Sequence, residues 1–123
     1  VLFRSSWKEG NDFSHMNIDY GQDPEIFGPR EVNYFKRQGS KMGKDLENIH
    51  YEVDEDGINK SLTITKGKDV TEISWYKDPE SEEWVMNTST RRNGKKDIEI
   101  YRQNKNKDPE DFIPGIGTHW HKD

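Results

Sequence analysis

The end of the chain holds the densest group of chemically active side chains: His119 and His121 flank Trp120, and they are two of the four histidines in the sequence. Imidazoles bind metals and transfer protons near neutral pH. On a strand, side chains two positions apart share a face, so both rings can act on one ligand. Three hypotheses follow for this tail: a metal site, a proton-transfer site, or an ordinary frayed terminus.

As a metal site, the two tail histidines are incomplete. Zinc sites in proteins take three or four protein ligands, and this chain has no cysteine. A third ligand would have to come from His50 or from an acid such as Asp108 or Glu110. The third-ranked hypothesis for function is therefore a divalent-metal-binding domain centred on His119 and His121, and otherwise no cofactor is expected.

As a proton-transfer site, the tail fits a metal-independent ribonuclease. Such an enzyme needs a base and an acid beside the 2′-hydroxyl and the leaving oxygen, with cations on the phosphate. His119 or His121 serves as one partner, and Glu99 or His50 serves as the other. The candidate phosphate-binding cations are Arg91, Arg92 and Arg102.

The same part of the chain resembles the ends of some bacterial polymorphic toxin domains. Those domains finish with a glycine turn, an Asp-Ile strand and a His-x-His step, which correspond here to residues 92–94, 96–100 and 118–121. The resemblance implies a secreted nuclease effector with His119 and His121 in its active site. This chain departs from the pattern because it lacks the further histidine that often follows the strand, and its net charge is −5. A nucleic-acid-binding surface is usually basic.

The remaining surface favours binding over catalysis. Tyr76 and Tyr101 are predicted on the sheet face opposite the apolar stripe, near the arginines, and tyrosine with arginine is typical of protein-binding surfaces. With Trp120 they form the candidate binding residues. These residues also fit ordinary cross-strand pairing on a wet sheet face. Because the sequence contains no motif of known catalytic mechanism and its charges are mixed, the leading hypothesis is a small soluble interaction or ligand-binding domain without catalytic activity, although the sequence leaves open whether the chain is an enzyme.

The composition restricts the partners. A net charge of −5 argues against non-specific contact with nucleic acid or an anionic membrane. No apolar run approaches the ~20 residues of a membrane span. A protein partner is expected, and nucleic acid only under the nuclease alternative. The compartment stays open, with a secreted or extracytoplasmic location slightly favoured.

A change of hydrophobic period near His50 indicates the elements that would position these groups. From His50 onward apolar and polar residues alternate, in runs that end at Asp-Gly, Lys-Gly, Asp-Pro and Asn-Gly turns. The pattern predicts five short strands in an antiparallel meander with one apolar and one wet face. Phe112, Ile113 and Ile116 are expected to anchor the tail onto this body.

One of those turns also has a spacing found in calcium sites. Glu52, Asp54 and Asp56 precede Gly57 with the spacing of the first ligands of an EF-hand loop. Position twelve of such a loop would be Thr63, where the family requires glutamate. We therefore interpret the segment as a solvated hairpin turn.

The segment before His50 predicts helices that cover the apolar face. A first helix is expected from Pro29, which suits a first helical position, and Met42 and Leu46 indicate a second one. The residues taken as further support for the first helix are Glu31, Val32 and Phe35. The predicted fold class is α+β, with an N-terminal arm and one or two short helices packed on the five-stranded meander.

The predicted organisation is a single domain over residues 29–123 with a C-terminal tail over 104–123, preceded by an irregular arm over 1–28. Residues 14–16 read Ser-His-Met, which is typical of a cloning remnant before a start codon. We therefore hypothesise that residues 1–15 are foreign to the native chain.

Overall fold

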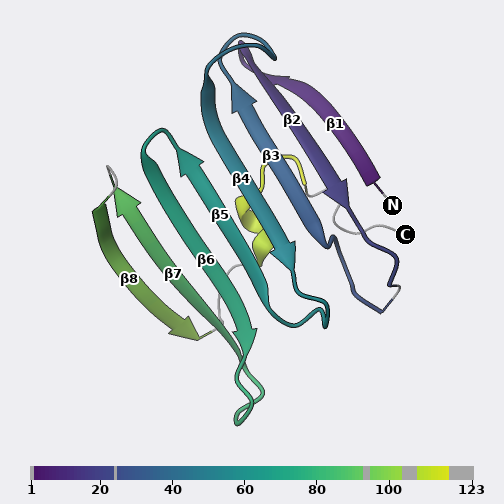
Figure 1. Ribbon diagram of the computed structural model, residues 1–123, viewed down its shortest axis with the longest axis vertical. Helices are drawn as coiled ribbons and strands as arrows, with labels where there is room; N and C mark the ends of the chain where they lie inside the picture. Colours follow the sequence, from purple (N-terminus) through teal and green to yellow (C-terminus); the bar gives the residue numbers. More distant parts are fainter. Residues whose placement is uncertain (1, 24, 93–94, 104–107, 117–123) are drawn as a thin grey trace.

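The chain folds into a single antiparallel sheet (Figure 1). The computed structural model describes residues 2–23, 25–92, 95–103 and 108–116, of which 95–103 are described by their backbone alone. The eight strands found in these ranges are β1 (Leu2–Glu9), β2 (Asp12–Asp19), β3 (Glu31–Arg37), β4 (Asp45–Val53), β5 (Lys60–Lys66), β6 (Asp69–Lys77), β7 (Trp84–Arg92) and β8 (Lys95–Gln103). Each strand pairs with the next one along the chain, so the topology is a meander.

One face of the sheet forms the core because alternate residues of each strand are apolar and point to it. The buried side chains on this face come from β2 through β7 and include Met16, Ile18, Val32, Tyr34, Ile49, Tyr51, Leu62, Ile73, Trp75 and Met86. Only 28% of the chain is apolar. The large aromatic side chains supply much of the buried area that a chain poor in aliphatic residues otherwise lacks.

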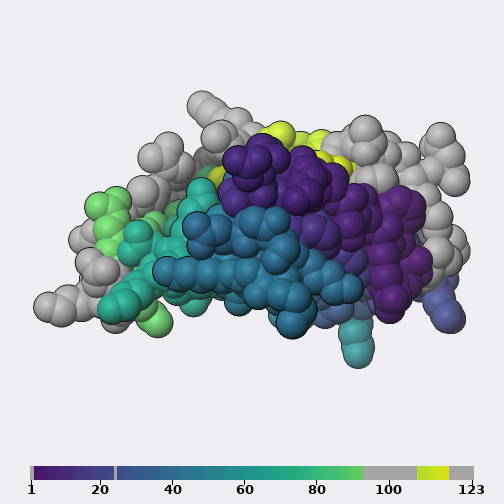
Figure 2. Space-filling view, turned by 90° about the horizontal axis from the view of Figure 1, so that it is seen from above, coloured from purple at the N-terminus to yellow at the C-terminus, as the bar shows by residue number. Residues whose placement is uncertain are grey.

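A strap formed by residues 108–116 covers this core face. It contains the 3₁₀ turn η1 (Pro109–Phe112). Ile113 and Ile116 are buried, and the ring centroid of Phe112 lies 6.0 Å from that of Trp75. The strap lies on one side of the sheet (Figures 1 and 2, yellow). The prediction that this part of the chain anchors onto the body is confirmed.

Gly115 allows the strap to approach the other edge of the sheet. Its φ of +77° is a conformation that residues with a Cβ atom rarely adopt. A Cβ atom there would lie 3.0 Å from the indole of Trp7 on β1. The strap therefore contacts Trp75 on β6 and Trp7 on β1, and it takes the place of the helices that were expected to cover the core.

The predicted α+β class is wrong, because the ranges that the structure describes contain no α-helix. The segment expected to start a helix at Pro29 forms β3. Val32 and Phe35, three residues apart, were interpreted as one helical face. Val32 instead shares the core face with Tyr34, and Phe35 points to the other side. The second predicted helix is the hairpin loop and the beginning of β4, with Met42 87% exposed.

The expected irregular arm is also wrong. Residues 2–9 and 12–19 form β1 and β2, a regular hairpin in which Ser14 is fully buried. The polar and aromatic residues of this segment alternate, and that alternation is the strand signal that was missed. That residues 1–15 are foreign stays a hypothesis, although residues 2–9 and 12–15 are paired into the sheet.

The strands predicted from His50 onward are present as β4 to β8, in antiparallel register. The predicted five-stranded sheet is wrong, because β1, β2 and β3 extend the same sheet to eight strands. The turn after β4 is a hairpin turn, as interpreted from the sequence. The Asp54 carboxylate accepts hydrogen bonds from the backbone N–H of Ile58 at 3.0 Å and from the amide of Asn59 at 2.7 Å. The predicted Asn93-Gly94 turn lies outside the described residues.

Candidate functional site: the open face of the sheet

The sheet face opposite the strap, called the open face below, carries polar side chains in rows that cross β2, β3 and β4. Strand register defines these rows because antiparallel partners lie directly opposite one another. One row is Asp19, Glu31 and Glu52, the next is Asn17, Asn33 and His50, and the third is His15, Phe35 and Asn48.

The first row places acids side by side. Glu31 lies opposite Asp19 on one side and opposite Glu52 on the other. Like charges directly opposite across strands destabilise a sheet. The Asp19 carboxylate accepts a hydrogen bond from the backbone N–H of Gly21 at 2.8 Å. The row therefore concentrates negative charge at a place where a cation would relieve it.

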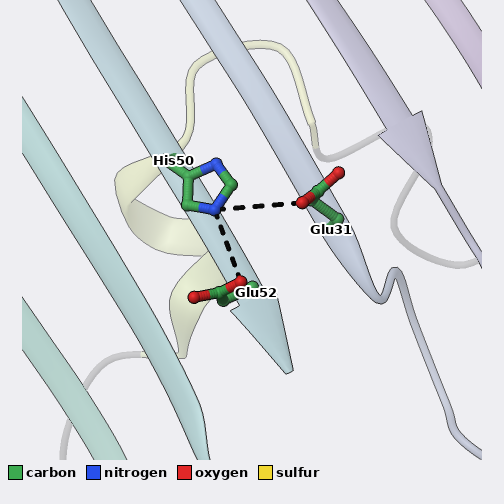
Figure 3. Close-up of side chains that lie close together, drawn as sticks. All are labelled: Glu31, His50 and Glu52. Atoms are coloured by element: carbon green, nitrogen blue, oxygen red, sulfur yellow. Dashed lines mark ion pairs between the residues drawn. The ribbon is translucent and has the colours of Figure 1, made fainter. Parts of the chain in front are cut away.

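His50 points into this acidic row (Figure 3). Its Nε2 lies 3.6 Å from Oε2 of Glu52 and 4.0 Å from Oε2 of Glu31. One donor atom from each of the three residues lies within 4.8 Å of the others. The side chains of His50, Glu31 and Glu52 are 36%, 49% and 59% exposed, so a dissolved ion can reach all three.

Asn33 fixes the orientation of the His50 ring. Nδ1 of His50 lies 2.7 Å from Oδ1 of Asn33. An amide oxygen only accepts hydrogen bonds, so Nδ1 carries the hydrogen in this contact. In the neutral ring the lone pair is then on Nε2, which faces the two carboxylates. Metal-binding histidines generally have this arrangement, with the second ring nitrogen held by a carbonyl or carboxylate oxygen.

The spacing of the three donors suits a small divalent ion. Bonds of 2.0–2.2 Å to a tetrahedral ion place ligand atoms about 3.3–3.6 Å apart. The His50–Glu52 pair already has this spacing at 3.6 Å, and Glu31 at 4.0 Å needs a small side-chain rotation. One imidazole and two carboxylates suit Zn²⁺ and similar transition metals. Ca²⁺ and Mg²⁺ prefer ligand sets of oxygen alone.

His15, the other described histidine, has partners at both ring nitrogens. Nε2 donates to Oδ1 of Asn17 at 3.1 Å, and Nδ1 accepts from the Ser6 hydroxyl at 2.6 Å. Its ring lies 6.5 Å from that of Phe13 and 5.2 Å from that of Phe35. His15 is therefore a packed structural residue with no ring nitrogen left for a ligand.

A pocket of about 300 Å³ adjoins the acidic row. Its lining residues are Asp19, Gly21, Arg30, Glu31, Glu52 and Val53. Two of them, Glu31 and Glu52, are also ligands of the candidate metal site, and Arg30 is the basic residue of the lining. Any group bound in this pocket would therefore lie beside the candidate metal site.

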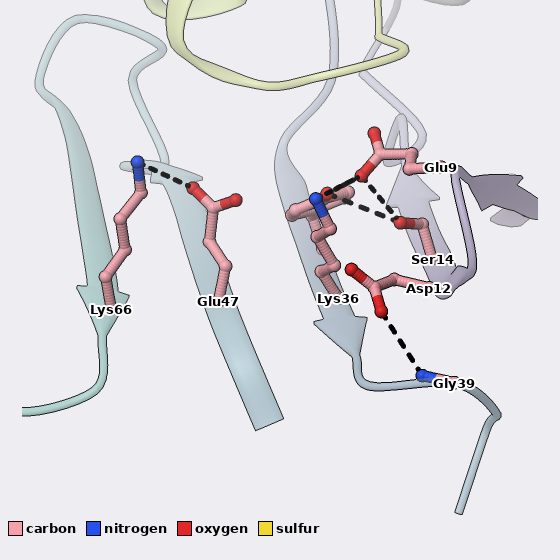
Figure 4. A network of polar contacts seen from close by, with 8 residues as sticks. Glu9, Asp12, Ser14, Lys36, Gly39, Glu47 and Lys66 are labelled. Carbon is pink, nitrogen blue, oxygen red and sulfur yellow. Dashed lines mark hydrogen bonds and ion pairs between the residues drawn. The ribbon is translucent and has the colours of Figure 1, made fainter. Parts of the chain in front are cut away.

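On the core face, a second polar cluster, around the carboxylate of Glu9, stabilises the fold. Glu9 accepts hydrogen bonds from Ser14 at 2.9 Å and Tyr34 at 3.0 Å, and Lys36 lies 3.5 Å away (Figure 4). Burial acts to raise the pKa of Glu9, but these donors, with Trp7, lower it overall. Burial, aided by Glu9, raises the pKa of Tyr34 well above its usual range. This cluster is internally satisfied and has no position for a ligand.

The sequence-predicted site residues are dispersed. Arg91 and Arg92 are exposed at the end of β7, and Tyr76 on β6 is 37% exposed. His50 lies on β4, three strand spacings or about 14 Å from β7, which is too far for His50 and Arg91 to share one phosphate. Glu99, Tyr101 and Arg102 lie in β8, where register pairs them with Ser89, Asn87 and Met86.

Among the described residues, the predicted further ligands Asp108 and Glu110 are not brought together with His50. His119, Trp120 and His121 lie outside the described residues. Asp108 and Glu110, offered as further ligands, belong to the strap behind the sheet, whereas His50 is in front of it (Figure 3). Neither acid can share an ion with His50.

Glu31, Glu52 and Asn33 were missed as site residues. Glu31 was interpreted as a charge at a helix N-terminus, and Glu52 as part of an incomplete calcium loop. The available signal was the alternation of Glu31 with Asn33 and of His50 with Glu52, which places each pair on one face of a strand. The register between β3 and β4 then joins the two pairs.

Comparison with known proteins gives no family: no family model matches the chain, and neither a curated protein nor a solved structure matches it significantly. Among the described residues, no helix has the length and apolar character needed to span a membrane. The function must therefore be inferred from the site itself.

Proposed function

We propose that this domain is a binding module that holds a divalent transition-metal ion on the open face of its sheet. Zn²⁺ is the ion that we propose first. The ligands are Glu31, His50 and Glu52. The observation that carries the proposal is the orientation of His50, whose Nδ1 is held by Asn33 while its Nε2 faces both carboxylates. The proposal keeps the non-catalytic binding domain expected from the sequence and assigns the metal to a different site.

The competing explanation is a protonated His50 paired with the two glutamates. Exposed ion pairs contribute only about 0–1 kcal/mol, and one imidazolium leaves an excess negative charge on Glu31 and Glu52. A divalent ion balances both glutamates and uses the Nε2 lone pair, so it satisfies the cluster better than a proton does.

The proposal is tested by titrating the metal-free protein with Zn²⁺ in a calorimeter. Because a ligand is lost, we expect His50→Ala to weaken binding by about 100-fold or more. His15→Ala is the matched control on the same face and should bind as the wild type does. The variant with both His119→Ala and His121→Ala separates this site from the tail and should also retain binding.

Two results would overturn the proposal. One is a Zn²⁺ affinity that is the same in His50→Ala and in the wild type. The other is loss of binding in the double tail variant alone, which would show that His119 and His121 bind the metal.

A further inference from the structure

Arg30 lines the pocket beside the proposed metal site. Its backbone N–H donates to the carbonyl oxygen of Asp19 at 2.7 Å, and its own carbonyl oxygen accepts from Val53 N–H at 2.9 Å. The aliphatic part of its side chain lies over Gly21, where a Cβ atom would come within 2.6 Å of Cγ of Arg30. The absence of a side chain at Gly21 therefore lets Arg30 lie against this backbone.

The guanidinium of Arg30 has no ion-pair partner among the residues that the structure describes. Arg30 lines the same pocket as Asp19, Glu31 and Glu52. A planar guanidinium binds a carboxylate through two parallel hydrogen bonds. One anion-binding group is thus available in the pocket.

The metal supplies a second anion-binding point. An ion held by three protein ligands keeps an open coordination position. The bound ion also balances the charges of Glu31 and Glu52. The loaded pocket therefore repels an anion less than the metal-free pocket does.

We infer that the metal-loaded pocket binds a small dicarboxylate, with one carboxylate on the open position of the ion and the other on Arg30. This inference rests on the proposed metal site. Two separate anion-binding points in one pocket favour a ligand with two carboxylates over one with a single carboxylate. The volume of about 300 Å³ is at the small end for ligand pockets and suits a short diacid.

The experiment begins with Zn²⁺ titration, as above, and continues with succinate titrated into the Zn²⁺-loaded protein. Acetate is the monocarboxylate control, and metal-free protein is the second control. Succinate should bind the loaded protein at least about tenfold more tightly than acetate and should not bind without the ion. The visible absorption of a Co²⁺-loaded sample reports whether succinate joins the ion on the protein or removes it.

Arg30→Met should lower succinate affinity at least about tenfold and leave Zn²⁺ affinity unchanged, which also shows that the variant is folded. Arg91→Met, a substitution of an exposed arginine on β7, is the charge-matched control and should bind succinate as the wild type does. If Arg30→Met fails to fold, Arg30→Lys replaces it, and it should weaken binding because the two-pronged contact is lost.

The outcomes separate the two proposals. If Zn²⁺ does not bind, both are overturned. If Zn²⁺ binds but succinate binds no better than acetate, binds equally well to the Arg30 variants, or merely removes the ion, the dicarboxylate inference alone is wrong.

Discussion

Two histidines on the same face of one sheet have different roles. His15 on β2 has a partner at each ring nitrogen and packs between Phe13 and Phe35. His50 on β4 has one nitrogen held by Asn33 and the other directed at two carboxylates. The difference teaches that the presence of a histidine says little about function, because what matters is which of its atoms are already occupied.

Carboxylates in this molecule show the same contrast. Glu9 receives hydrogen bonds from Ser14 and Tyr34 and a charge contact from Lys36. Glu52 lies opposite another glutamate and contacts only His50 in the interactions that the structure describes. A satisfied carboxylate stabilises the fold, whereas a carboxylate facing a like charge favours a cation.

The amides that hold the two histidines give the sharpest test of the comparison. Asn33→Ala removes the group that fixes the ring of His50, and we expect Zn²⁺ affinity to fall about 10- to 100-fold although all three ligands remain. Asn17→Ala removes the corresponding partner of His15 and should leave Zn²⁺ affinity unchanged. Calorimetric titration measures both, and equal effects of the two variants would break the comparison.

Glu9→Gln should reduce the free energy of unfolding by about 1–3 kcal/mol at neutral pH, because Ser14 and Tyr34 would then donate to a neutral amide oxygen instead of a charged carboxylate. The pKa of Glu9 is lowered in the folded protein, so its contribution is fully present above the unfolded-state pKa. That contribution disappears as the pH falls through the folded-state pKa. Urea unfolding of the variant and the wild type from pH 7 to pH 3 measures the difference, which should shrink on acidification.

A difference between the two proteins that stays constant over this pH range would show that packing, rather than ionised Glu9, stabilises the fold. Glu47→Gln is the control. Glu47 also lies at the rim of the core face and pairs with Lys66 at 3.6 Å, through a lysine that is 66% exposed. A pair with only one exposed partner, as here, should contribute about 1 kcal/mol or less.

Glu52→Gln should have the smallest effect on the metal-free protein, and in the opposite direction. Relief of the repulsion with Glu31 should raise the free energy of unfolding by about 0.2–1 kcal/mol. In excess Zn²⁺ the order reverses, because the wild type gains binding free energy that the variant loses. Urea unfolding with and without Zn²⁺ measures the reversal, and a Glu52→Gln variant less stable in both conditions would contradict the account of the acidic row.

The second half of the fold was predictable because Ile49, Tyr51 and Val53, and later Ile73 and Trp75, alternate with polar residues between clear turns. The first half was not predictable from the sequence, because apolar and polar residues alternate less regularly in its strands. Val32 and Phe35 fit a helical spacing as well as they fit a strand, and only pairing with β2 and β4 decides between the two.

The candidate site was partly predictable. His50 was recognised as a possible ligand or base from its residue type alone. Glu31 and Glu52 are its neighbours only because β3 and β4 pair in one particular register, and local sequence patterns do not determine the register between strands. Sequence reasoning gave most weight to His119 and His121 because they are close in the chain, whereas this site is assembled from separate strands.

The strap has a consequence for the way the chain folds. All strand pairings join neighbours in sequence, so each hairpin can form from local contacts, which favours fast folding. The contact of Gly115 with Trp7 joins residues from opposite ends of the described chain. We expect docking of the strap to be the late, slow step, with the hairpins already formed when the two ends meet.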